Sequence, residues 1–123
     1  MTDKTYTEET VRLAETRTDV RIITWTGLVN GQAGVPIEWP FGADKSIQVD
    51  GTPGAAGHIL LQGSNDRVNF YTLTDPEGNN IDFTATGLKA ITELALQVRP
   101  FVSAGDGTSL WTATLLMRRA RTY

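Results

Sequence analysis

The sequence contains one histidine, His58, and no cysteine, which limits the nucleophilic chemistry that it could perform. Hydrolysis of the Ser/His/Asp type needs a histidine that accepts the serine proton and is oriented by a carboxylate. Ser64 lies six positions after His58, but the chain has no Gly-x-Ser-x-Gly segment to present a serine on a sharp turn. We therefore expect His58 to be a solvated residue at the start of a strand, and we predict that the protein is not an enzyme.

A run of oxygen-bearing side chains between positions 75 and 82 is the best candidate for a metal site. The segment reads Asp-Pro-Glu-Gly-Asn-Asn-Ile-Asp, and calcium prefers such oxygen ligands. It lacks the EF-hand spacing and its closing glutamate, and the same residue types gather at turns for backbone reasons alone. Zinc is disfavoured by a single histidine and no cysteine. A plain turn is therefore favoured, with calcium as the lesser alternative, and we predict no cofactor and no metal.

Binding of phosphate or nucleic acid is also disfavoured. Gly51, Gly54 and Gly57 are spaced like a glycine-rich loop, but no lysine follows them. The formal net charge of -3 gives no sign of the basic face that nucleic-acid binders carry. We expect a loop at these glycines and no nucleic-acid partner.

The basic residues cluster only at the C-terminus, at Arg118, Arg119 and Arg121. The simpler interpretation is a solvated tail. The functional interpretation is a salt-sensitive contact with an acidic surface of a partner protein.

The elements that must position these residues form one domain. A chain of 123 residues can bury a single core, and 40% hydrophobic with 20% charged residues is an ordinary globular mixture. Residues 1–19 are polar and mixed in charge, so we predict an extended N-terminal arm followed by a single domain over 20–123. The chain begins without the apolar stretch of a signal peptide, and no apolar run is long enough for a membrane helix. We expect no membrane attachment.

Short segments rich in β-branched and aromatic residues follow one another at regular intervals, separated by Gly, Pro, Asn and Asp. Most connections are too short for parallel pairing. The pattern predicts an all-β antiparallel sandwich of about eight strands, with jelly-roll or Greek-key connections. One or two helical turns are possible at 87–94, with Leu88, Ile91 and Leu94 facing inward. Trp25, Trp39, Phe70 and Trp111 are expected in the core. The predicted strands are 20–29, 36–41, 46–49, 58–63, 68–73, 81–84, 96–102 and 109–118.

Two stretches resemble known proteins. Residues 60–73, with Gly-Ser-Asn-Asp at the turn, resemble a hairpin of discoidin-like β-sandwiches, although that family's ligand-binding loops have no match here. Residues 73–79, 98–108 and the closing strand to Arg118 occur in an order similar to small structural proteins of tailed bacteriophages, of the head-decoration or cement type. The similarity spans roughly residues 58 to 118.

The phage resemblance implies a protein that reinforces the capsid shell. It implies the major capsid protein as partner, a homo-oligomer with a trimer favoured, and a location on the virion surface after synthesis in the host cytoplasm. The arm would become ordered on a neighbour, and the edge strand at 36–41 would be covered by it. The predicted partner-binding residues are Tyr6, Val11, Leu13, Trp39, Arg118, Arg119 and Arg121.

Two other functions are compatible with the sequence. A carbohydrate-binding module for host adhesion would need exposed rings among Trp39, Trp111 and Tyr71, with Asn and Asp nearby. A tail or adaptor ring protein would assemble into a larger ring.

Overall fold

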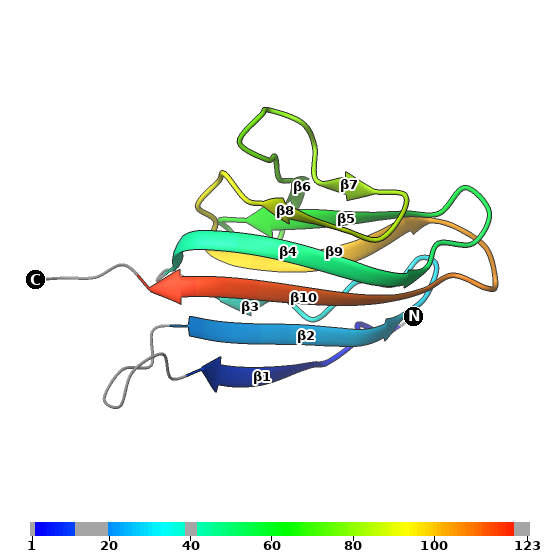
Figure 1. The fold of residues 1–123 in the computed structure, drawn as a ribbon, viewed down its shortest axis with the longest axis horizontal. Helices are drawn as coiled ribbons and strands as arrows, with labels where there is room; N and C mark the ends of the chain where they lie inside the picture. Colours follow the sequence, from blue (N-terminus) through cyan, green and yellow to red (C-terminus); the bar gives the residue numbers. More distant parts are fainter. Residues whose placement is uncertain (1, 12–19, 39–41, 120–123) are drawn as a thin grey trace, which may run out of the picture.

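Two antiparallel sheets of five strands each face one another in the computed structural model (Figure 1). The structure describes residues 2–11, 20–38 and 42–119, and the side chains at 10, 11, 42, 43 and 119 lie outside the description. The described residues form no helix, so none is available to cross a membrane. The strands are β1 (Tyr6–Val11), β2 (Val20–Leu28), β3 (Ile37–Glu38), β4 (Gly42–Thr52), β5 (His58–Ser64), β6 (Tyr71–Thr72), β7 (Asp82–Phe83), β8 (Gly87–Ala90), β9 (Gln97–Ala104) and β10 (Leu110–Arg119).

The strand order is that of a jelly roll with one strand added. The first sheet has the order β1-β2-β10-β4-β8, and the second has β3-β9-β5-β6, with β7 also paired to β5. From β2 to β5, and again from β8 to β10, the chain crosses to the other sheet at each connection. The predicted antiparallel sandwich is confirmed.

The core lies between the two sheets, because alternate residues of the long strands point inward. In β10, for example, Trp111, Ala113, Leu115 and Met117 are buried, and the residues between them face outward. Burying one large apolar side chain contributes about 1.5–3 kcal/mol, so this inner layer dominates stability. The fully buried large side chains are Trp25, Trp111, Ile23, Leu28, Ile47, Ile59, Leu61, Ile81, Leu115, Val49 and Val98.

The aromatic residues expected in the core differ in burial. Trp25 and Trp111 are fully buried, as predicted. Phe70 is only half-buried, and the Arg99 guanidinium lies 3.9 Å from the centre of its ring. This cation–π contact covers the ring without moving it into the core. Trp39 lies outside the described residues.

The N-terminal segment takes part in the first sheet. Residues 6–11 of the predicted arm are extended, but they form β1, which pairs with β2 from Tyr6↔Trp25 to Val11↔Val20. Backbone pairing with β2 therefore orders these residues within the chain. Residues 12–19 lie outside the described residues.

The segment predicted to contain helical turns is instead a strand and a loop. Gly87–Ala90 forms β8 against β4, and the Ile91 N–H continues the ladder by donating to the Lys45 carbonyl at 3.0 Å. Ile91 is buried as predicted, whereas Leu88 and Leu94 are 65% and 68% exposed. The open edge of β4 offers backbone partners, and this tertiary pairing overrides the i, i+3 spacing of the apolar residues.

Candidate functional site

The candidate nucleophilic residues lie at opposite ends of β5. His58 Nδ1 lies 2.9 Å from Asp82 Oδ1, so the histidine has a carboxylate partner. Ser64 is six residues further along the same strand, which places it about 20 Å away at 3.3 Å per residue. Its hydroxyl donates to Asp66 Oδ1 at 2.9 Å and accepts from the Arg67 N–H at 3.0 Å. The two groups cannot act together on one substrate.

The predicted turn at residues 75–79 uses the oxygens that calcium would need. Asp75 Oδ1 accepts hydrogen bonds from the N–H groups of Glu77 and Asn79, each at 3.0 Å. The other oxygen of Asp75 lies 3.5 Å from the Lys89 ammonium, and Asp82 points to His58. Over the described part of the chain, no three His, Asp or Glu side chains gather in a way that could hold a metal ion.

The predicted partner-binding residues lie in different places. Tyr6 begins β1, and its ring packs edge-on against Trp25 with the ring centres 5.8 Å apart. Part of the Tyr6 ring is therefore in contact with its own chain. Val11 ends β1 opposite Val20, but its side chain is outside the description. Leu13, Trp39 and Arg121 lie outside the described residues.

Two of the predicted arginines end β10. Arg118 is exposed and forms an ion pair with Asp44 of β4, which lies directly across from it. Arg119 continues the strand opposite Gly42, and its side chain is outside the description. Arg118 is therefore already ion-paired with Asp44 of its own chain.

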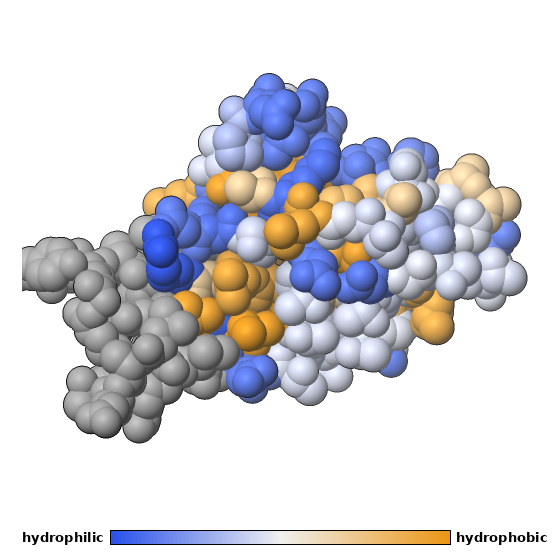
Figure 2. Space-filling view, in the orientation of Figure 1, coloured by the Kyte–Doolittle hydropathy of each residue, from blue (hydrophilic) through white to orange (hydrophobic). Residues whose placement is uncertain are grey.

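A mixed apolar and hydroxyl surface covers the outside of the first sheet. We call it the outer β10 face. Cross-strand pairing places Ala90, Ser46, Leu116 and Ile22 in one row. Figure 2 shows hydrophobic atoms gathered near the middle of this side of the molecule. The outer β10 face consists of Ile22, Thr24, Ser46, Gln48, Leu88, Ala90, Thr114 and Leu116.

None of these eight residues is charged, but the same side of the sheet also carries Glu9, which pairs with Ile22, and Asp50, which accepts a hydrogen bond from Gln48. A third group of charges, the Arg118–Asp44 pair, follows Leu116 along β10. An apolar row across three strands can lose its water at low cost, because it has few polar groups to desolvate. Sequence reasoning missed this surface because it depends on which strands are neighbours.

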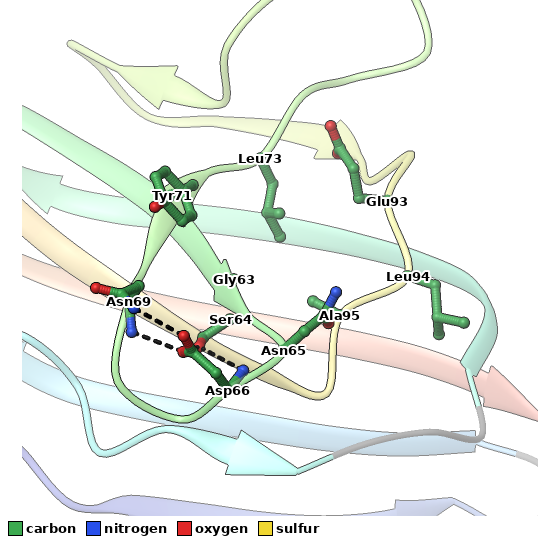
Figure 3. A pocket seen from close by; sticks show the side chains of 10 residues that line it. All are labelled: Gly63, Ser64, Asn65, Asp66, Asn69, Tyr71, Leu73, Glu93, Leu94 and Ala95. Carbon is green, nitrogen blue, oxygen red and sulfur yellow. Dashed lines mark hydrogen bonds between the residues drawn. The ribbon is translucent and has the colours of Figure 1, made fainter.

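A shallow pocket of about 340 Å³ opens beside the end of β5 (Figure 3). The turn after β5 and strand β6 form one wall, and the segment between β8 and β9 forms the other. Figure 3 shows Tyr71 and Leu94 on opposite sides, with Gly63 and Leu73 between them. The lining residues are Gly63, Ser64, Asn65, Asp66, Asn69, Tyr71, Leu73, Glu93, Leu94 and Ala95.

The two carboxylates of this pocket are already bound within the protein. Hydrogen bonds from the Asn69 and Val68 N–H groups, together with the Asn69 and Ser64 side chains, hold the pKa of Asp66 well below its ordinary value of 3.8. Burial acts to raise the pKa of Glu93, but hydrogen bonds from Thr74 outweigh it and the net shift is downward. Both groups are therefore anions at neutral pH that serve as acceptors for neighbouring backbone and hydroxyl groups.

No protein-family model matches this chain, and no curated protein matches its sequence. The function must therefore be argued from the two surfaces themselves. Of the rings that a carbohydrate-binding module would use, Trp111 is fully buried and Tyr71 is 72% exposed. Only Tyr71 remains available among the described residues.

Proposed function

We propose that this chain is a non-catalytic structural protein of a bacteriophage virion, which binds the major capsid protein and reinforces the shell. The observation that carries the proposal is the outer β10 face. Its apolar residues Leu116, Ile22 and Ala90 lie on the outer side of the first sheet, and nothing in the chain's described residues covers them. The charged residues of this side, Glu9, Asp44, Asp50 and Arg118, surround the apolar row.

The arrangement of the polar atoms on this face supports a protein partner. Threonine and serine hydroxyls stand beside the apolar row, at Thr24, Thr114 and Ser46. Such a surface can bury apolar area and still hydrogen-bond to a partner's backbone, as protein interfaces do. The Arg118–Asp44 pair at its margin offers both charges to the rim of an interface, where they influence specificity more than affinity.

The fold and the sequence resemblance point to the same class of partner. Jelly rolls occur in viral capsid and lectin domains, which is support by analogy only. The stretches 73–79 and 98–118, which resemble decoration proteins, contribute the turn after β6 and the strands β9 and β10. The major capsid protein is therefore the partner that we propose, with a homotrimer on the capsid surface as the assembled form.

Each contact of a small module with the shell is expected to be weak. Three linked copies of the outer β10 face would raise the effective concentration of the second and third contacts and so increase the total affinity. A protein made in the host cytoplasm could in this way bind the shell tightly once the capsid surface has formed.

The test uses empty shells assembled from the major capsid protein of the same virus without this chain. The wild-type protein should co-sediment with the shells, and Leu116→Lys should weaken binding at least tenfold by placing a charge in the apolar row. Val68→Lys is the matched control, because Val68 is 76% exposed in the turn between β5 and β6. Equal binding by Leu116→Lys and the wild type would contradict the proposed face.

The mass of the free protein in solution tests the proposed trimer. Sedimentation equilibrium should give three times the mass of the 123-residue chain. A ring of many copies would contradict the trimer and would favour the tail or adaptor alternative.

A further inference from the structure

We infer that the pocket beside Tyr71 binds a neutral carbohydrate, of the size of one or two sugar rings. This site is separate from the outer β10 face, and it does not depend on the capsid proposal. It would give the protein a second binding activity, toward glycans.

The apolar surface of the pocket suits the C–H face of a sugar ring. Tyr71 is 72% exposed and Leu94 is 68% exposed, and they stand on opposite walls (Figure 3). Single exposed apolar residues are common, but two large ones that line the same pocket indicate a binding site. An aromatic ring with a hydroxyl at its edge can pack against the sugar and hydrogen-bond to it at once.

The floor of the pocket is firm. Leu73 and Ala95 are buried, and a Cβ added at Gly63 would lie 2.8 Å from a Leu73 methyl group and 2.9 Å from the Ala95 Cβ. This close packing prevents the residues at the base of the pocket from moving inward. A volume of about 340 Å³ lies at the lower end of the range for small-molecule pockets, which limits the ligand to a small one.

The charged groups of the pocket are unavailable to a ligand. Both oxygens of Asp66 accept hydrogen bonds, from the Ser64 hydroxyl and from the backbone and side chain of Asn69 among others. Both oxygens of Glu93 accept from Thr74, at 2.8 and 2.6 Å. A cation would have to break these bonds, and an anion would be repelled by the two carboxylates, so a neutral ligand fits best.

The polar atoms that remain free are those of amides and a phenol. Asn65 accepts the Leu96 N–H through Oδ1, which leaves its NH₂ group as a donor. Asn69 donates its NH₂ group to Asp66, which leaves its Oδ1 as an acceptor. The pocket therefore offers a donor at Asn65, an acceptor at Asn69 and the Tyr71 hydroxyl, which can donate and accept. Within the described part of the chain, none of these three groups has a hydrogen-bond partner. Sugar hydroxyls, which both donate and accept, match this set.

The wall that carries Asn65 and Asn69 is held in place before any ligand arrives. Asp66 fixes the turn from inside, and the Arg67 guanidinium binds Glu38 of β3 at 2.6 and 3.3 Å. A preorganised turn loses less conformational entropy when a ligand binds.

The experiment screens the fluorescently labelled full-length protein on an array of neutral and acidic glycans and then titrates the best hit by NMR. We expect hits among neutral glycans, with chemical-shift changes at Tyr71, Asn65 and Leu94. Tyr71→Ala should weaken binding at least tenfold, and Tyr71→Phe should weaken it less, because the ring remains. Leu110→Ala is the matched control, since Leu110 is 52% exposed on β10, away from the pocket, and this variant should bind like the wild type.

A second variant separates binding from folding. Asn65→Asp keeps the oxygen that accepts the Leu96 N–H but removes the free amide donor. It should reduce neutral-glycan binding several-fold while the Tm stays close to that of the wild type. The inference is overturned if no neutral glycan binds, if only acidic glycans bind, or if Tyr71→Ala binds as well as the wild type. None of these results bears on co-sedimentation with capsid shells.

Discussion

The Asp66 carboxylate accepts two hydrogen bonds from Asn69, one from its backbone N–H at 2.8 Å and one from its side-chain amide at 2.7 Å. The Val68 N–H donates to the same carboxylate at 2.9 Å. The three bonds close the turn between β5 and β6 around a single side chain. The position of Asn69 in the pocket beside Tyr71 therefore depends on the charge of Asp66.

The first prediction concerns acid stability. The Asn69 bonds lower the pKa of Asp66 from its ordinary value of 3.8, so the folded protein binds this proton less readily than the unfolded chain. Its contribution to stability is present above pH 3.8 and is lost as the pH falls further, toward the lowered folded-state pKa. Asp66→Asn should lower the Tm at pH 7, and the difference from the wild type should shrink below pH 3.8.

The measurement is thermal unfolding followed by circular dichroism, from pH 7 to below pH 3.8. Asp50→Asn is the control, because Asp50 is exposed on β4 and its carboxylate accepts from the Gln48 side chain. A Tm difference between Asp66→Asn and the wild type that is the same at all pH values would contradict the prediction.

The second prediction concerns the floor of the pocket. Gly63→Ala would force the new methyl group to within 3 Å of both Leu73 and Ala95. Overpacking of this kind costs about 1–3 kcal/mol. Gly107→Ala is the matched control, since an added Cβ there meets nothing within 4 Å, and it should change the free energy of unfolding by less than about 0.5 kcal/mol. Urea unfolding of the two variants measures the difference, and equal stabilities would show that the floor can move.

The third prediction concerns calcium. Because Asp75 is bound by the Glu77 and Asn79 N–H groups and faces Lys89, calcium would have to displace several partners to bind it. Millimolar CaCl₂ or EDTA should therefore leave the Tm unchanged. A rise in Tm with calcium that Asp75→Asn abolishes would restore the metal site that the sequence left open.

Much of the fold follows from local patterns in the sequence. Alternation of apolar residues in 20–29 and 109–118 predicted that Trp25 and Trp111 would be buried, because alternate side chains of a strand share one face. The two prolines of 36–41 predicted an edge strand, and Ile37–Glu38 does lie at the edge of the second sheet. These inferences need no knowledge of distant neighbours.

The two proposed binding surfaces depend on strand neighbours that the sequence does not reveal. Tyr71 and Leu94 are 23 positions apart and line the same pocket only because β5 pairs with β6 on one side and β9 on the other. Likewise, Ile22 and Leu116 share a row only because β2 lies beside β10. Leu88 and Leu94 were predicted to face inward because their spacing suits a helix, and the open edge of β4 made this prediction wrong.

The last prediction compares the two buried tryptophans. The Trp25 indole N–H donates to the Val35 carbonyl at 3.0 Å, whereas the Trp111 indole N–H has no acceptor among the residues that the structure describes. Both side chains are fully buried, so replacement by phenylalanine removes similar amounts of packed surface. Trp25→Phe also leaves the Val35 carbonyl without this donor, while Trp111→Phe removes an unpaired polar group from the core.

Trp25→Phe should therefore lower the free energy of unfolding by about 1–3 kcal/mol more than Trp111→Phe does. Urea unfolding followed by far-UV circular dichroism measures both variants without relying on tryptophan fluorescence. Val49→Ala, at a third fully buried position in the same core, shows whether the assay resolves losses of this size. Equal losses for Trp111→Phe and Trp25→Phe would contradict the prediction, because an unpaired Trp111 N–H contributes nothing to the stability of the folded state.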